Sequence, residues 1–118
     1  MVFAESLKRS VKGEHGQRSS VSRSYYYAFH KASSYLNSLP DIPSLDSTDS
    51  HEVIIRTLKA RPDLREKEIG KILKRMKDRR VKADYRDIYP GNLESDVDMN
   101  ISEAKEIEAK IESLIRAT

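Results

Sequence analysis

Apolar side chains recur along the chain at intervals of three and four residues, the spacing that places them on one face of an α-helix. No stretch sustains the apolar and polar alternation of a strand. The sequence therefore predicts an all-α fold, an up-and-down bundle of four to five helices in one domain spanning residues 1–118. The expected helices run from Val2 to Val11, from Ser19 or Ser20 to Leu39, from Asp49 to the residue before Pro62, from Asp63 to Asp87, and from Asn100 or Ser102 onward.

Breaks between these segments follow from glycine, proline and capping residues. Gly13 and Gly16 predict a break before the second helix, and residues 40–49, PDIPSLDSTD, predict a loop. Asp63 followed by Glu66 matches the capping box, in which two side chains at a helix start satisfy free backbone amides. The fourth segment is therefore expected to begin at Asp63.

Each segment after the first has an apolar face that is expected to form the core. Those faces carry Tyr25, Ala28, Phe29, Ala32, Leu36 and Leu39; Ile54, Ile55 and Leu58; Ile69, Ile72, Leu73, Met76 and Ala83; and Ala104, Ile107, Ile111, Leu114 and Ile115. A neighbouring polar side of the second segment carries Arg23, Tyr26, Tyr27 and His30. That polar side is a candidate site.

Charge is unevenly distributed, although the formal net charge is only +3. Residues 56–86 hold thirteen basic and five acidic side chains, whereas residues 87–118 hold three and eight. A basic middle segment suits an anionic partner, and RNA is the obvious candidate. The alternative is that these charges simply form the solvated faces of helices.

Arg80 falls within the apolar stripe of the fourth segment when residues are placed at about 100° intervals. A guanidinium is costly to bury unless a carboxylate or a phosphate pairs with it. One interpretation is an internal ion pair with Asp84, one turn later, that locks helix packing. The other is that Arg80 lines a groove and binds phosphate through its planar fork of donors, while Arg79, Lys82 and Arg86 attract a nucleic-acid backbone.

Few residues support other chemistry. The chain has no cysteine, and its three histidines lack metal-ligand spacing, so no metal is expected. No nucleophile elbow or glycine-rich phosphate loop occurs, and no cofactor is expected. His30 alone could act as a general acid or base near neutral pH. The lack of cysteine and of a long apolar segment predicts a soluble, cytoplasmic protein without a membrane partner.

Two motifs, in this order, resemble those of the HEPN domain family. SRSYYYAFHKA on the second segment supplies Ser22, Arg23, Tyr25, Tyr26, Phe29 and His30, and RRVKADY on the fourth supplies Arg80, Ala83, Asp84 and Tyr85. The order and spacing of all five segments also fit the small single-domain members. The resemblance therefore covers nearly the whole chain.

This resemblance implies a helical bundle that forms a homodimer, with the two arginine motifs together in a cleft. It further implies a metal-independent ribonuclease, in which the ribose 2′-hydroxyl attacks the adjacent phosphate, arginine stabilises charge and histidine moves protons. Many small members resemble toxins paired with a nucleotidyltransferase-type antitoxin. This chain departs from the nuclease pattern because no histidine follows Arg80, and Asp84 or Tyr85 occupies that place.

Three possibilities follow. The first is an RNA-cleaving or RNA-targeting toxin, with Arg80, Asp84 and His30 as candidate catalytic residues. The second is a non-catalytic module whose groove binds a nucleotide, an RNA end or a partner protein, and the third is a purely structural bundle. Candidate binding or supporting residues are Arg23, Tyr26, Arg79, Lys82, Tyr85 and Arg86. We expect Arg23, Tyr26 and His30 to form the wall of a groove that faces Arg80 and Asp84.

Overall fold

The computed structural model describes residues 13–42 and 51–117, and within these ranges it contains four helices and no strand. Helix α2 spans Glu14–Asn37, α3 spans His51–Ala60, α4 spans Leu64–Tyr85 and α5 spans Leu93–Arg116. The prediction of an all-α bundle is confirmed for this part of the chain. The helix expected over 2–11 lies outside the described residues. None of the described helices is both long enough and apolar enough to span a membrane.

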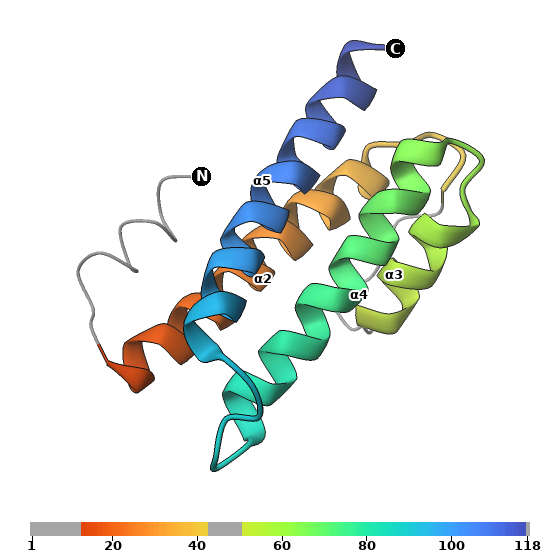
Figure 1. Ribbon diagram of the computed structural model, residues 1–118. Helices are drawn as coiled ribbons and strands as arrows, with labels where there is room; N and C mark the ends of the chain where they lie inside the picture. Colours follow the sequence, from red (N-terminus) through yellow and green to blue (C-terminus); the bar gives the residue numbers. More distant parts are fainter. Residues whose placement is uncertain (1–12, 43–50, 118) are drawn as a thin grey trace.

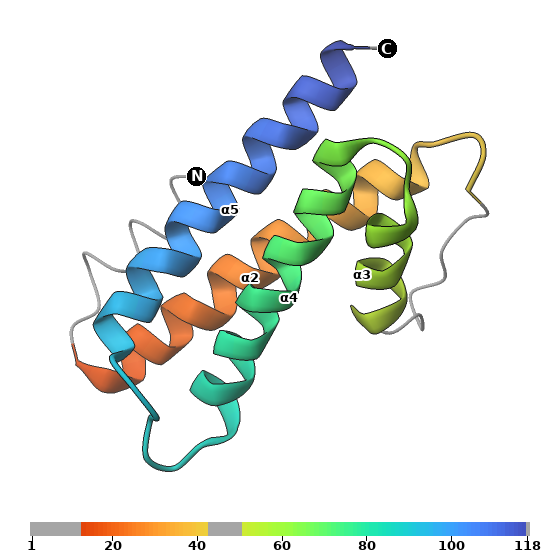
Figure 2. The ribbon, with the colours of Figure 1, turned by 45° about the vertical axis from the view of Figure 1, so that its right-hand side comes forward.

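The three long helices lie side by side and alternate in direction along the chain (Figure 1). Helix α2 packs against both α4 and α5, and α4 also contacts α5. The short helix α3 forms an antiparallel hairpin with α4 at the end of the bundle where α4 begins (Figure 2). Residues from α2, α3 and α4 can therefore meet on one side of the molecule.

Two clusters of buried side chains form the core. The larger one draws on all four helices, with Tyr25, Leu58, Leu73 and Ile107 among its fully buried members. The smaller one joins Val21, Ala83, Val97 and Ile101 where α2 and α5 begin and α4 ends. Burying one large aliphatic side chain contributes about 1.5–3 kcal/mol, so these clusters account for most of the stabilisation of the bundle.

The predicted core is confirmed with two exceptions. Leu39 is partly buried against the larger cluster, and Ile115, expected on the apolar face of α5, is 58 % exposed. Ile115 lies in the last turn of α5. Its neighbour Leu114 is 5 % exposed and belongs to the larger cluster, so the face of the helix decides which of the two is buried.

Helix α2 begins at Glu14, so the predicted start at Ser19 or Ser20 was wrong. Gly13 is the N-cap with a φ of 97°, a conformation that glycine adopts without a steric penalty. Gly16 is buried inside the helix instead of breaking it. A glycine inside a helix costs only about 1 kcal/mol, which packing can offset.

Helix α5 begins at Leu93, well before the predicted start at Asn100 or Ser102. The side chain of Asn92 caps it by accepting a hydrogen bond from the Ser95 amide at 2.9 Å. Val97 extends the apolar face through the added turns, while Asn100 is fully buried and donates to the Val21 carbonyl. An asparagine expected to start the helix instead holds its middle against α2.

Asp63 caps α4 as predicted, because its carboxylate accepts from the Arg65 amide at 2.8 Å. Glu66 does not complete the capping box. Its side chain is buried and accepts hydrogen bonds from the Tyr35 hydroxyl at 2.8 Å and from Arg61 at 3.0 Å. Glu66 therefore ties the start of α4 to the end of α2.

Candidate functional site

Arg80 projects from α4 toward α2, with its side chain only 15 % exposed. Its Nη2 donates to the Tyr26 hydroxyl, and its guanidinium carbon lies 5.1 Å from the centre of the Tyr26 ring. Its Nε lies 3.1 Å from Oδ2 of Asp84, which is 30 % exposed. The internal ion pair therefore forms, and Arg80 also faces α2, as the groove interpretation expected.

Hydrogen-bonding capacity remains on this guanidinium. The Nε–H is buried and does not point at Asp84 well enough to form a hydrogen bond. Nη1 makes no hydrogen bond with any described residue. An arginine offers five donors, so Arg80 can contact an additional acceptor such as a phosphate oxygen.

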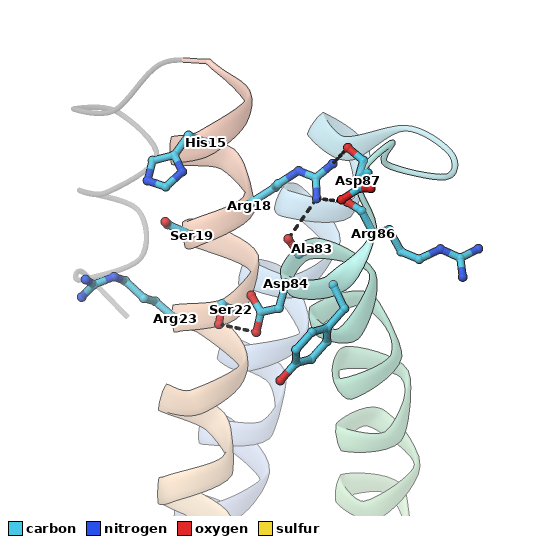
Figure 3. Close-up of a pocket in the computed structure, with 10 residues that line it drawn as sticks. His15, Arg18, Ser19, Ser22, Arg23, Ala83, Asp84, Arg86 and Asp87 are labelled. Carbon is cyan, nitrogen blue, oxygen red and sulfur yellow. Dashed lines mark hydrogen bonds between the residues drawn. The ribbon is translucent and has the colours of Figure 1, made fainter.

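Asp84 is held between α4 and α2. Besides pairing with Arg80, its Oδ2 accepts from the Ser22 hydroxyl at 3.4 Å, and Figure 3 shows these two side chains pointing toward each other. One oxygen atom thus serves both contacts. A phosphate approaching Arg80 would compete directly with this carboxylate.

His51, which the sequence-based reasoning set aside, lies beside this arginine. Its Nδ1 is 2.6 Å from the Tyr25 hydroxyl, and its ring stacks on Phe29 with centroids 4.1 Å apart. Burial, followed by the positive charges of Arg80 and Lys77, lowers the pKa of the His51 imidazole below its usual value of 6.5. His51 is therefore held mainly neutral near pH 7.

The position of His51 could have been found from the helical period. It lies three, four and seven residues before Ile54, Ile55 and Leu58, so it belongs to the buried face of α3. Its pairing with Tyr25 spans 26 positions, and no local pattern predicts a contact of that range. The helical spacing indicates that His51 is buried, but it does not indicate which aromatic side chains His51 contacts.

His30 lies on the same side of α2 as Tyr26, as predicted, and is exposed. Its ring centre is 6.3 Å from that of Tyr26 and 5.7 Å from that of Phe29. It makes no hydrogen bond or ion pair with the described residues. We refer below to the Arg80 site, which comprises Tyr26, His30, His51, Arg80 and Asp84.

Arg79 and Lys82 point away from the Arg80 site, and their attraction for a nucleic-acid backbone stays a prediction. Arg79 pairs with the buried Glu103 of α5 and donates to Asn100 at 3.0 Å. Lys82 pairs with Asp96 of α5 at 3.1 Å. Adjacent residues on a helix point about 100° apart, so Arg79 faces α5 while Arg80 faces α2.

Ion pairs between α4 and α5 account for part of the uneven charge along the chain. Glu103 of α5 binds Arg75 at 2.8 Å as well as Arg79, and Asp96 of α5 binds Lys82 at 3.1 Å. Three basic side chains of the middle segment are thus paired with two acidic side chains of the last segment within the bundle. The solvated-face and anionic-partner interpretations both overlooked this pairing.

A groove of about 510 Å³ lies next to Asp84, between the start of α2 and the end of α4 (Figure 3). Arg18 lies at its inner wall, where its guanidinium donates to the carbonyls of Ala83, Arg86 and Asp87. Arg18 therefore caps the C-terminus of α4, a role that sequence reasoning missed. Its partners lie more than sixty residues away, and no local motif marks them.

Three predicted supporting residues lie at the outer edges of this groove. In Figure 3, the Arg23 side chain points away from α4, so it does not face Arg80 and Asp84 as expected. Arg86 also points outward and is exposed. Tyr85 is 69 % exposed, and the Arg80 guanidinium carbon lies 5.8 Å from its ring centre.

Cofactor and metal candidates are few. Within residues 13–42 and 51–117, no group of three or more histidine, aspartate or glutamate side chains is arranged to hold a metal ion. The chemistry that the described site offers is a guanidinium with spare donors, two imidazoles, a carboxylate and exposed aromatic surface.

Comparisons with models of protein families, with curated proteins and with solved structures found no match to this chain. The Arg80 site and the motif resemblance are therefore the features of this chain that bear on its function.

Proposed function

We propose that this protein targets RNA, binding it at the Arg80 site and cleaving it without a metal ion. The observation that carries the proposal is the guanidinium of Arg80, which has unused donors and lies beside two imidazoles. The order of the SRSYYYAFHKA and RRVKADY motifs adds the resemblance to HEPN ribonucleases. Because α5 pairs with Arg75, Arg79 and Lys82 of α4, the Arg80 site is a more specific candidate than overall charge.

The residues suit a cleavage in which the ribose 2′-oxygen bonds to phosphorus and the 5′-oxygen leaves, giving a cyclic phosphate. Arg80 would stabilise the negative charge that develops on the phosphate oxygens. His30, which is exposed, would take the proton of the 2′-hydroxyl, and water would protonate the departing 5′-oxygen. Asp84 would release Arg80 as the phosphate arrives. The exposed ring of Tyr85 offers a surface on which a base can stack.

The test is incubation of purified protein with single-stranded RNA in the presence of EDTA. We expect cleavage by the wild type, and a loss of about a hundredfold or more in Arg80→Ala, which lacks the charge-stabilising group. Lys71→Gln is the matched control, because it removes one exposed positive charge from α4 on a side away from the site. Equal cleavage by Arg80→Ala and Lys71→Gln would refute the assignment.

Binding without cleavage is the second candidate. It is favoured by the ion pair that already occupies Arg80 and by the absence of a histidine after Arg80 in the sequence. Fluorescence anisotropy with labelled RNA or a nucleotide would then show affinity that depends on Arg80, with no product formed in the EDTA assay. A protein that neither binds nor cleaves would be a structural bundle.

From the resemblance alone we further propose a homodimer that acts as a toxin and is neutralised by a nucleotidyltransferase-type antitoxin. Light scattering of the purified chain measures the dimer directly. Growth arrest on expression, relieved when a co-encoded nucleotidyltransferase is expressed with it, would support the pairing. Growth unaffected by expression would contradict the toxin role.

A further inference from the structure

The environment of His51 combines aromatic burial with nearby positive charge. Its imidazole is enclosed by three rings of α2, stacking on Phe29 and Tyr25 while the Tyr26 ring meets it nearly perpendicularly at 5.8 Å. The guanidinium of Arg80 lies over the Tyr25 and Tyr26 rings as well. His51 and Arg80 thus share the same two tyrosines.

The hydrogen bond between the Tyr25 hydroxyl and Nδ1 of His51 assigns the tautomer of this imidazole. Tyr25 is fully buried, and its hydroxyl has no hydrogen-bond partner among the described residues other than Nδ1 of His51. Burial also raises the pKa of the Tyr25 phenol well above its usual value, so the hydroxyl keeps its proton. It must donate that proton to Nδ1, and the neutral ring then carries its own hydrogen on Nε2. Nε2 makes no hydrogen bond within the described part of the chain, which leaves one donor available.

Charged groups from three helices face this imidazole. Lys77 and Arg80 approach from α4, His30 from α2, and Glu52 follows on α3 itself. Lys77 is paired with Glu52, and Arg80 with Asp84. A proton added to His51 would place a third cation beside these two pairs, and the free protein disfavours it.

We propose that the Arg80 site binds the phosphate group of RNA together with one proton, which His51 takes up. This inference rests on the proposed function. An anion at Arg80 offsets the positive field that opposes protonation of His51, and the stacked rings of Phe29 and Tyr25 then stabilise the imidazolium. Nδ1–H can donate to the Tyr25 oxygen in this state, so the contact between α2 and α3 is kept with its direction reversed.

Coupling between two binding events is reciprocal. If the anion favours protonation of His51, then acidification must tighten anion binding by the same factor. Phosphodiesters do not change charge near neutral pH, so the effect must come from the protein. We expect RNA affinity to rise by up to about tenfold for each unit by which the pH falls, over the range between the pKa values of His51 in the free and bound protein.

The experiment is an NMR pH titration of the histidine side chains in the full chain, alone, with inorganic sulfate, and with a short 2′-O-methyl oligoribonucleotide that lacks a terminal phosphate and cannot be cleaved through its 2′-oxygens. Sulfate is a dianion throughout this range, and chloride keeps the ionic strength equal. Both ligands are expected to raise the pKa of His51 by at least about half a unit. Arg80→Ala should abolish the shift, whereas Lys71→Gln, on a side of α4 away from the site, should keep it.

A second measurement follows RNA affinity between about pH 5.5 and pH 7.5, a range chosen to span the titration of histidine. His51→Gln keeps an amide that can bond to the Tyr25 hydroxyl but cannot titrate, so its affinity should lose most of the pH dependence. Lys71→Gln should keep it. If His51→Gln fails to fold, the wild-type titration still decides.

The outcomes separate this inference from the proposed function. RNA binding that requires Arg80 but leaves the pKa of His51 unchanged would overturn the inference and leave the function standing. A pKa shift with sulfate but no RNA binding would support a proton-coupled anion site and overturn the RNA function. No shift with either ligand would overturn the inference.

Discussion

Replacement of Glu103 by glutamine tests whether α5 neutralises α4. Glu103 is only 8 % exposed as a side chain and bridges two arginines of α4, with Arg75 at 2.8 Å and Arg79 in closer contact. Glutamine keeps the shape of the side chain but removes its charge. It also turns an amide NH₂ toward a guanidinium, so one of the two arginines loses its acceptor.

The loss of unfolding free energy caused by Glu103→Gln depends on how exposed each of the two arginines is. Removing one partner of a buried ion pair costs about 3–5 kcal/mol, whereas exposed pairs contribute about 1 kcal/mol or less. Arg75 is 52 % exposed and can turn to water, so its share is small. Arg79 is 16 % exposed but retains its bond to Asn100 at 3.0 Å. We therefore expect Glu103→Gln to lower the free energy of unfolding by about 2–3 kcal/mol, less than the full cost of a buried pair.

Urea unfolding followed by circular dichroism measures this difference, and the melting temperature should fall by about 10 °C. Asp78→Asn is the matched control, because it breaks the exposed pair with Lys74, one turn away on α4, and should cost less than about 0.5 kcal/mol. If Glu103→Gln were no more destabilising than Asp78→Asn, the charges of α4 and α5 would not be paired in solution. The basic face of α4 would then be available to an anionic partner.

Three further predictions concern α3 and the Arg80 site. Gly70→Ala should lower the free energy of unfolding in urea by about 1–3 kcal/mol, because the new Cβ would lie 2.9 Å from Cγ and 3.1 Å from the backbone nitrogen of Lys59. Stability equal to that of the wild type would mean that α3 and α4 are packed less closely. Asp84→Asn should tighten RNA binding by about threefold to tenfold in anisotropy assays, because it frees Arg80 from its internal partner and the binding free energy gains about as much as one partly exposed ion pair contributes. Weaker binding would mean that Asp84 holds Arg80 in the orientation that binds RNA. The free protein should lose stability as pH falls below 6.5, because the pKa of His51 is lower in the folded protein and the unfolded chain therefore binds the proton more readily. Melting curves at matched pH should show a smaller loss for His51→Gln, and equal losses would exclude His51 as the cause.

Periodicity predicted the helical core well because burial repeats along each helix. Ile54, Ile55 and Leu58 were assigned to the core from spacing alone, and all three are buried. The same spacing placed Arg80 on the inner face of α4, where it lies. Signals of this kind are local, since each residue is compared only with neighbours one or two turns away.

Helix starts were predicted less well, because polar residues that favour caps also occur within helices. Asp63 caps α4, but Asn100 satisfies its amide by bonding to the Val21 carbonyl of another helix. Nothing near Asn100 in sequence distinguishes the two uses. Gly16 likewise lies inside α2 because its surroundings offset its low helix propensity.

The candidate site could be predicted only in part, because its contacts join distant segments. The pair of Arg80 and Asp84 lies within one helix and was foreseen as an alternative. The pair of His51 and Tyr25 crosses from α3 to α2, and the pairing of Arg79 with Glu103 crosses from α4 to α5. Such partners are set by packing geometry, which the sequence specifies only through the fold as a whole.

The contact of Arg18 with the last turn of α4 has a consequence for motion. Helix ends fray because their final carbonyls lack amide partners, and such openings set the exchange of nearby amide hydrogens with solvent. Here one guanidinium from α2 holds the carbonyls of Ala83, Arg86 and Asp87 together. The first turns of α2 and the last turn of α4 should therefore open as a single unit, and the groove beside Asp84 should open and close with them.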